Sequence, residues 1–183
     1  GVQTCALPIL FNLVVTYHNG APDPVAGKPV PENEVLRGFE HVHPRAQAII
    51  RHGTDWKLWV LCDRDPVENW VDGRVALLGD AAHPTLQYMA QGACMAIEDA
   101  WVLAACLDAD PDQPRALARY QALRRDRCTR IVAAATANAR NYHLSGPKRL
   151  AGHTALRLAN HLAPRAVFER FAWVYDHDAT ALA

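Results

Sequence analysis

Two short stretches of the chain combine residue types that could bind a small ligand. Asp80 follows Gly79 directly after an apolar run, and its carboxylate could accept hydrogen bonds from two neighbouring hydroxyl groups, as sugars and sugar alcohols supply. Gly92, Ala93 and Cys94 begin a second, helix-like run. The first amides of a helix have no partners within it and carry partial positive charge, so a negative ligand there gains about 0.3 to 2 kcal/mol. These stretches predict a ligand site at the carboxyl end of a strand in an open α/β sheet.

A purely structural interpretation stays open for the same residues. Asp80 could simply cap a turn in an ordinary strand-loop-helix unit, and for Gly79-Asp80-Ala81 taken alone we favour that interpretation. Gly92 lacks a side chain and would let a ligand approach the backbone closely. The choice between the two interpretations therefore depends on the sequence around these residues.

The hydrophobic pattern predicts the elements that would position them. Residues 74–78 are predicted to form a strand, and the run is continuously apolar from Val75, as in a strand covered on both faces. Apolar residues at steps of three and four predict a helix from Gly92 to Leu107. Its predicted buried stripe consists of Ala93, Ala96, Ile97, Ala100, Trp101, Ala104 and Leu107.

A second long helix is predicted from about Arg115 to Asn141. Its apolar stripe consists of Leu117, Tyr120, Cys128, Ile131, Val132 and Ala135. Its arginines are interpreted as a solvated face, because they lie largely away from the stripe and the chain has no net charge: Arg124, Arg125, Arg127 and Arg130. Shorter helical segments at 150–162 and 166–175 follow, separated by Pro164.

The first third of the chain has a different pattern. The predicted elements are a strand at 10–17, a proline-rich loop at 21–31, helices at 32–43 and from Pro44, and a strand at 56–62. The two strands are predicted to be neighbours, and a boundary between structural regions is placed near residue 65. The predicted fold class is α/β, with an α+β mixture in this chain and long C-terminal helices.

Composition disfavours several classes of function. The 183 residues carry 19 basic and 19 acidic side chains, so no long-range field would attract nucleic acid or an anionic membrane. No apolar run approaches the roughly 20 residues that a membrane span needs. The 5 cysteines form no Cys-x-x-Cys pair and lie mainly among apolar residues, which predicts buried free thiols in a reducing cytoplasm. No carboxylate or cysteine stands at ligand spacing from His41 and His43, so no metal site is predicted.

Three segments with intact spacing carry a family resemblance: Gly79 to Pro84, Gln91 to Ala93, and Ile97 to Ala100. Together they resemble the second flavin-contacting motif of the single-component, group A FAD-dependent aromatic hydroxylases. The flanks agree, since residues 59–66 resemble the segment by which that family leaves its substrate domain, and residues 173–175 resemble its C-terminal end. The resemblance covers most of the chain from about residue 10.

The resemblance implies roles for the residues of the predicted ligand site. Asp80 would bind the ribityl chain of FAD, Pro84 would lie beside the isoalloxazine, and the Gly92 and Ala93 amides would face its N1 and O2, where they would stabilise negative charge. The implied cofactor-binding residues are Gly79, Asp80, Pro84, Gln91, Gly92, Ala93 and Cys94. NADH or NADPH would be the co-substrate.

The loop between His83 and Gln91 would pass the flavin face where the substrate ring sits. Within the family, 3-hydroxybenzoate 6-hydroxylases resemble this chain in having Gln at position 87, where salicylate hydroxylases tend to have Pro. The Gln87 amide could bind a substrate hydroxyl or carboxylate, or could be an ordinary polar loop residue. Tyr88 and Met89 could line the substrate pocket, and plain packing is at least as good an interpretation.

The implied activity is hydroxylation of a small aromatic acid, most directly 3-hydroxybenzoate to 2,5-dihydroxybenzoate (gentisate). Salicylate hydroxylation to catechol is the enzymatic alternative, and a non-catalytic interaction module is an alternative of another class. The chain lacks the Gly-x-Gly-x-x-Gly turn of the family, so it is expected to be the C-terminal fragment of a longer enzyme whose catalytic base lies elsewhere. A homodimer is the oligomeric state considered for that longer protein.

The same resemblance divides the chain into three parts. Residues 1–9 match no segment of the family and are predicted to be a non-native leader. Residues 10–65 are predicted to belong to a β-sheet substrate domain, and residues 66–183 to a Rossmann-like FAD-binding domain with its C-terminal helices. The fragment alone is expected to bind FAD weakly and to show little turnover, because the pyrophosphate site is missing.

Overall fold

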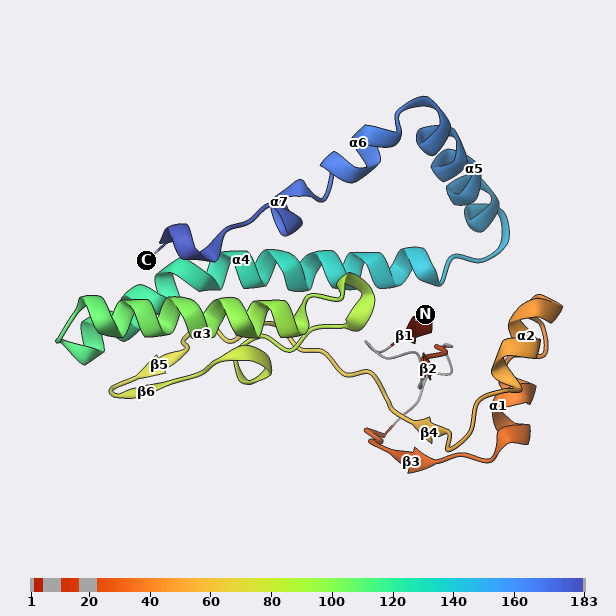
Figure 1. Cartoon of the computed structure of the whole chain (residues 1–183), viewed down its shortest axis with the longest axis horizontal. Helices are drawn as coiled ribbons and strands as arrows, with labels where there is room; N and C mark the ends of the chain where they lie inside the picture. The colour runs from red at the N-terminus through yellow and green to blue at the C-terminus, as the bar shows by residue number, and fades with distance from the viewer. Residues whose placement is uncertain (1, 5–10, 17–22, 183) are drawn as a thin grey trace. The chain divides into compact units, whose positions relative to one another are not determined.

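A computed structural model of the chain describes residues 2–4, 11–16 and 23–182 (Figure 1). The chain divides into two compact units, Gly1–Leu61 and Cys62–Ala183. The assignment of these parts to a substrate domain and a FAD-binding domain stays a prediction. Within the described residues, no helix combines the length and the apolar character that a membrane crossing requires.

The first unit contains short strands and two short helices. Its elements are β1 (Val2–Thr4), β2 (Phe11–Leu13), β3 (Lys28–Pro29), α1 (Glu32–Gly38), α2 (Pro44–Ile50) and β4 (Lys57–Leu58). β1 pairs antiparallel with β2, and β3 pairs antiparallel with β4. Pro44 stands at the start of α2, and the Arg45 amide donates to His43 Nδ1 at 3.2 Å, so both residues favour a helix that begins here.

Several sequence-based expectations for this unit are wrong. Within the described residues, no ladder joins the segment 56–62 to the segment 10–17; its strand part, β4, pairs with β3, inside the predicted loop. The ladder is short because Pro29 lacks an amide hydrogen. α1 ends at Gly38, well before the predicted end at His43, since glycine disfavours the helical state. Residues 10 and 17, the ends of the first predicted strand, lie outside the described residues.

The second unit is mainly helical, and in Figure 1 its two longest helices, α3 and α4, run side by side. Its elements are β5 (Val71–Asp72), β6 (Val75–Ala76), η1 (Gly79–Ala81), η2 (Gln87–Met89), α3 (Gly92–Ala109), α4 (Gln113–Tyr142), α5 (Gly146–Leu162), α6 (Pro164–Glu169), α7 (Ala172–Tyr175) and η3 (Ala179–Leu182). The Asp112 side chain caps α4 by accepting from the Arg115 amide. The predicted mixture of helices and strands with long C-terminal helices is confirmed.

The strand predicted at 74–78 is reduced to β6. It pairs antiparallel with β5 across a turn at Gly73, whose φ is +57°. Val75 is 66% exposed, so the expectation of a strand covered on both faces is wrong. Among the described residues no third strand pairs with this hairpin, and without strand neighbours an apolar run has no sheet in which to be buried.

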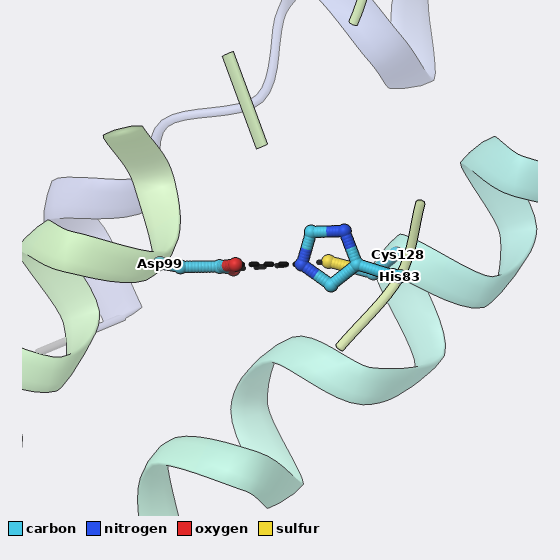
Figure 2. Close-up of side chains that lie close together, drawn as sticks. All are labelled: His83, Asp99 and Cys128. Atoms are coloured by element: carbon cyan, nitrogen blue, oxygen red, sulfur yellow. Dashed lines mark hydrogen bonds and ion pairs between the residues drawn. The ribbon is translucent and has the colours of Figure 1, made fainter. Parts of the chain in front are cut away.

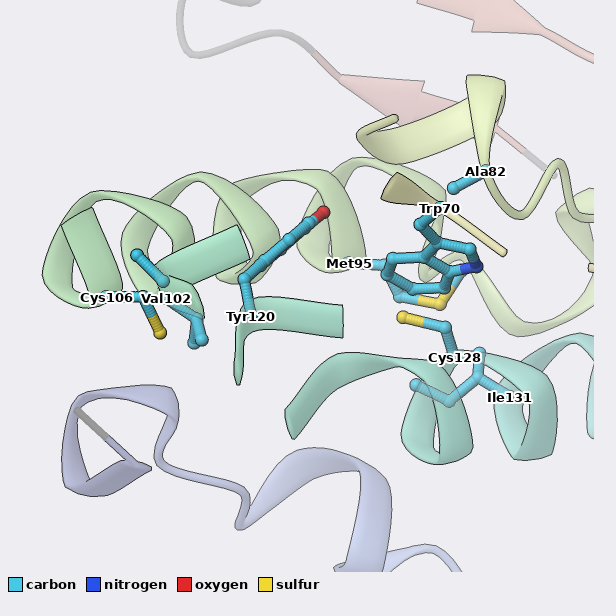
Figure 3. Packing of buried hydrophobic residues seen from close by; sticks show 9 residues of the cluster. Trp70, Ala82, Met95, Val102, Cys106, Tyr120, Cys128 and Ile131 are labelled. Carbon is cyan, nitrogen blue, oxygen red and sulfur yellow. The ribbon is translucent and has the colours of Figure 1, made fainter. Parts of the chain in front are cut away.

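The core of this unit lies between the hairpin, α3 and α4 (Figure 3). Its fully buried members are Trp70, Ala82, Met95, Val102, Cys106, Ala116, Tyr120, Cys128 and Ile131. The polar atoms of the two large aromatic residues are satisfied there: Trp70 Nε1 donates to the Val67 carbonyl at 2.8 Å, and Tyr120 Oη donates to the Leu77 carbonyl at 3.0 Å. The predicted stripe of α4 is buried throughout and is confirmed.

The predicted buried stripe of α3 is wrong. Met95, Asp99, Val102 and Cys106 form the buried face, whereas Ile97 is 70% exposed and Trp101, also in the predicted stripe, is 53% exposed. The helix is apolar on most of its surface, so the spacing of its apolar residues fits two faces equally well.

The prediction of buried free thiols holds only in part. Cys106 and Cys128 are buried, whereas Cys62 and Cys94 are exposed. Cys5 lies outside the described residues.

The two faces of α3 predict opposite responses to truncation in this chain. Met95→Ala is expected to lower the free energy of unfolding by about 2–5 kcal/mol, because it removes a fully buried side chain from a closely packed core. Trp101→Ala is expected to cost less than about 1 kcal/mol, although it removes more atoms. Urea unfolding of both variants measures the difference. A larger loss in the free energy of unfolding for Trp101→Ala would contradict the structure and support the buried face that was predicted from the sequence.

Candidate functional site

Four charged side chains of α3 and α4 form a largely buried group, here called the charge cluster: Glu98, Asp99, Arg124 and Arg127. Arg124 Nε donates to Asp99 Oδ1 at 2.8 Å, and both side chains are 0% exposed. Arg124 Nη2 also lies 2.7 Å from Glu98 Oε2. Arg127 binds both oxygens of Glu98 at 2.8 Å and donates to the carbonyls of α7 residues Trp173 and Val174. The cluster therefore connects α3, α4 and α7.

The second oxygen of Asp99 holds the turn that follows β6. Asp99 Oδ2 accepts from the Gly79 amide at 3.1 Å and lies 2.6 Å from His83 Nε2 (Figure 2). His83 is fully buried and stacks at a tilt on Trp70, with 5.2 Å between ring centroids. His83 therefore has a structural role in the loop that follows the turn.

The charge cluster was missed by the sequence analysis. Asp99 lies within the segment 97–100 that carried the family resemblance, but no role was derived for it, and the expectation that Arg124 and Arg127 are solvated is wrong. A signal was present: Arg124 stands four residues after Tyr120 and four before Cys128, which places it on the buried stripe of α4. An arginine at such a position requires a buried acidic partner.

The cluster keeps its carboxylates ionised. Burial raises the pKa of Asp99, but hydrogen bonds from His83, Arg124 and the Gly79 amide outweigh that effect, and the net pKa is below the ordinary value of 3.8. Burial likewise raises the pKa of Glu98, and the hydrogen bond from Arg127 together with the charge of Arg124 lowers it below 4.5. At neutral pH the cluster thus pairs two carboxylates with two guanidinium groups.

These pKa shifts predict acid sensitivity. Because the carboxyls of Glu98 and Asp99 bind protons more readily in the unfolded chain, their stabilisation is complete above the ordinary pKa values of 4.5 and 3.8 and is lost as the pH falls through the lower folded values. The free energy of unfolding is expected to fall steadily below about pH 5. Urea midpoints between neutral and acidic pH measure it; Glu98→Gln should flatten the profile, and an unchanged profile in that variant would contradict the assignment.

A metal ion does not fit the cluster. His83, Asp99 and Cys128 each offer a ligand atom, and these atoms lie within 4.8 Å of one another. The guanidinium of Arg124 already binds Asp99 Oδ1, however, and its fixed positive charge would repel a cation at the same carboxylate. Burial also raises the pKa of the Cys128 thiol to about 12, which disfavours the thiolate that a metal would need.

The turn at residues 79–83 presents one predicted ligand residue to solvent. Gly79 is buried with φ +58°, and a Cβ there would lie 3.2 Å from Ala96 Cβ, so a structural need explains this glycine. Asp80 is exposed, and its carboxylate has no hydrogen bond or ion pair with the described residues. Arg64 Nη2 donates to the Ala81 carbonyl at 2.5 Å, and Pro84 is half-buried beyond the turn.

The start of α3 has the open amides that an electron-rich ligand would need. Gln91 occupies the cap position without a side-chain capping bond, and the amides of Gly92, Ala93 and Cys94 have no acceptor among the described residues. A Cβ on Gly92 would meet only Thr85 Cγ2, at an ordinary 3.5 Å. Unlike Gly79, Gly92 is therefore not required by the packing of this chain, and an outside group approaching the backbone would explain it. Open amides of this kind suit an electron-rich ligand atom.

The predicted substrate residues lie in η2 and differ in their surroundings. The side chain of Gln87 is exposed. Tyr88 Oη lies 2.9 Å from His143 Nε2, and the Tyr88 carbonyl accepts from Asn138 at 3.1 Å, so η2 is fastened to the end of α4. Met89 is buried against Ala135 and Val174, which is the packing role that the sequence left open. Gln87 is thus the most exposed side chain of this group.

Comparison with known proteins identifies the class. Residues 39–135 match the family described as FAD binding domain, and the chain belongs to that family. It is 46% identical over 172 residues to 3-hydroxybenzoate 6-hydroxylase 1 of Aquipseudomonas alcaligenes, covering 92% of this chain and 42% of that protein.

Two solved structures share the fold. A salicylate hydroxylase substrate complex matches with a TM-score of 0.71 at 25% identity, over 99% of this chain and 45% of that one. HpxO of Klebsiella pneumoniae complexed with FAD and uric acid matches with a TM-score of 0.58 at 33% identity, over 68% of this chain and 32% of that one. The chain thus spans less than half the length of each of these relatives.

Proposed function

We propose that the chain forms the flavin-facing C-terminal part of an FAD-dependent aromatic hydroxylase that uses NADH or NADPH and O2. The observation that carries this proposal is that one packed unit contains both features of the predicted site: amides without acceptors at the start of α3, and the exposed carboxylate of Asp80. The family match and the similarity to named hydroxylases support it. The first unit would then belong to the substrate domain, and the second to the FAD-binding domain.

Bound FAD would supply the reduction of oxygen and the transfer of one oxygen atom to the ring. The chain's own residues would bind and orient it. Asp80 would accept hydrogen bonds from ribityl hydroxyls, and the Gly92 and Ala93 amides would donate to the N1–O2 edge and favour negative charge there. Pro84, half-buried beside the turn, would limit movement of the isoalloxazine.

The proposed substrate is 3-hydroxybenzoate, with gentisate as the product. Gln87 supports this choice, because the resemblance gives 3-hydroxybenzoate 6-hydroxylases Gln at this position and salicylate hydroxylases Pro. Its exposed amide can donate to a carboxylate and accept from a hydroxyl. The second candidate is salicylate, which is favoured by the fold match to a salicylate hydroxylase over 99% of the chain. In both cases one oxygen atom enters the ring and the other leaves as water, with NADH or NADPH as the electron donor. In the 3-hydroxybenzoate reaction a ring proton is lost, whereas in the salicylate reaction the carboxyl group leaves as CO2.

A chimaera tests the proposal. This chain would replace the matching segment of the Aquipseudomonas alcaligenes 3-hydroxybenzoate 6-hydroxylase 1, and products from 3-hydroxybenzoate and salicylate would be identified with each nicotinamide donor. Gentisate formation is expected. A folded, FAD-loaded chimaera that hydroxylates neither acid would contradict the proposal, and catechol from salicylate alone would favour the second candidate. The chain by itself is expected to bind FAD weakly, and tight stoichiometric uptake would contradict that expectation.

The proposed function also includes a cellular compartment and an oligomeric state. The buried free thiols Cys106 and Cys128 support a reducing compartment, and we place the protein in the cytoplasm. A homodimer of the longer protein is also proposed, and sedimentation of the chimaera tests it against a monomer.

A further inference from the structure

One oxygen of Asp99 binds both ends of the turn that carries Asp80. Asp99 Oδ2 accepts from the Gly79 amide at 3.1 Å and lies 2.6 Å from His83 Nε2. Within the turn the Gly79 carbonyl accepts from the Ala82 and His83 amides at 2.9 and 3.0 Å. The turn is therefore closed on itself and hydrogen-bonded to α3 through a single carboxylate oxygen, with the exposed Asp80 between its two anchored ends. Outside α3, the Ala82 carbonyl accepts from the Val67 amide at 2.9 Å and the Ala81 carbonyl accepts from Arg64.

Asp99 is itself held rigidly. Its other oxygen, Oδ1, accepts from Arg124 Nε at 2.8 Å, and the side chains of both residues are completely buried. His83 Nδ1 is buried without a partner among the described residues, so the bond to Asp99 is the polar contact that sets the orientation of the imidazole. A fixed acceptor thus ties both ends of the turn to α3.

We propose that Asp99 is the positioning residue of this turn: through Gly79 and His83 it sets where the Asp80 carboxylate stands, and Arg124 fixes Asp99 in turn. The part of this inference that concerns flavin rests on the proposed function. The part that concerns the geometry of the turn does not, and the two are tested separately.

The first test uses this chain without flavin. Amide hydrogen exchange is followed at Gly79 and His83 relative to the core amide of Val102, so that a general loss of stability cancels. Asp99→Asn is expected to raise the relative exchange rates about 10-fold or more, because a hydrogen bond to a charged acceptor is lost. Glu98→Gln is the matched control, since it removes the neighbouring charge while the bond from Arg124 Nε to Asp99 and the contacts of Asp99 to the turn remain, and its relative rates should rise far less than those of Asp99→Asn. Equal rates in the two variants overturn the proposal.

A second pair of variants covers the case in which Asp99→Asn does not fold. His83→Gln keeps a donor in nearly the position of Nε2, whereas His83→Ala removes it. The relative exchange rate of Gly79 is expected to rise in His83→Ala and to be restored in His83→Gln. The same rise in both variants, or in neither, overturns the proposal.

The second test measures FAD affinity in the chimaera. Asp80→Asn reports on the proposed function, and its failure to weaken FAD binding would contradict that function while leaving the exchange result standing. If Asp80→Asn weakens binding, Asp99→Asn should weaken it about 10-fold, with Glu98→Gln close to the parent. FAD affinity that falls in Asp80→Asn but stays unchanged in Asp99→Asn overturns the positioning role.

Discussion

Arg124→Met is expected to lower the free energy of unfolding of this chain by about 3–5 kcal/mol. Arg124 binds Asp99 and Glu98 at 2.8 and 2.7 Å, and its side chain is completely buried. Methionine fills a similar volume without charge, so Asp99 would remain buried with its negative charge facing an apolar side chain. The cost arises from that unpaired carboxylate more than from lost packing. Urea or thermal unfolding, followed by circular dichroism, measures it.

Arg125→Met on the same helix is the matched control. The Arg125 side chain is about half exposed, and its Nε lies 3.4 Å from Oδ1 of the exposed Asp126. A solvent-exposed ion pair of this kind contributes little to the free energy of unfolding. Its replacement should change the free energy of unfolding by no more than about 0.5 kcal/mol. A similar small change in both variants would show that the charge cluster does not stabilise the fold. The double variant Arg124→Met with Asp99→Asn should recover part of the loss, because it removes the unpaired charge.

The helices of the second unit followed closely from the sequence, and the strands did not. α3 and α4 are defined by local information: helical spacing over many residues, a capping Asp112 and a proline at the start of α4. A strand requires a partner, and the partners here are non-local. In β4, Lys57 and Leu58 lie opposite Pro29 and Lys28 of β3. The hydrophobic periodicity within either segment does not determine this pairing.

The candidate site shows the same division. Asp80 and Gly92 could be found from the sequence because each stands beside a recognisable strand or helix end, and the structure leaves both open to a ligand. The charge cluster could not be found, because Asp99 and Arg124 are 25 residues apart and their pairing depends on how α3 rotates against α4. The buried face of α3 was mispredicted, so the acid at its centre was overlooked.

Gly92→Ala is expected to separate flavin chemistry from folding. In this chain the added Cβ would meet only Thr85 Cγ2 at 3.5 Å, and alanine is preferred to glycine in a helix, so the free energy of unfolding should change by no more than about 1 kcal/mol. In the chimaera the same methyl group would stand between the helix amides and the flavin edge. Displacing the reacting groups by about 1 Å can cost on the order of 100-fold in rate, and we expect a loss of hydroxylation of that size.

Gly79→Ala provides the opposite pattern. Its φ of +58° costs an alanine about 1–2 kcal/mol, and the new Cβ would lie 3.2 Å from Ala96 Cβ, so the chain itself should lose stability. Urea unfolding of this chain and FAD titration of the chimaera, both carried out for the two variants, distinguish the roles. If Gly92→Ala leaves FAD affinity and turnover at the parent level, no flavin approaches that backbone, and the open amides at the start of α3 need another ligand.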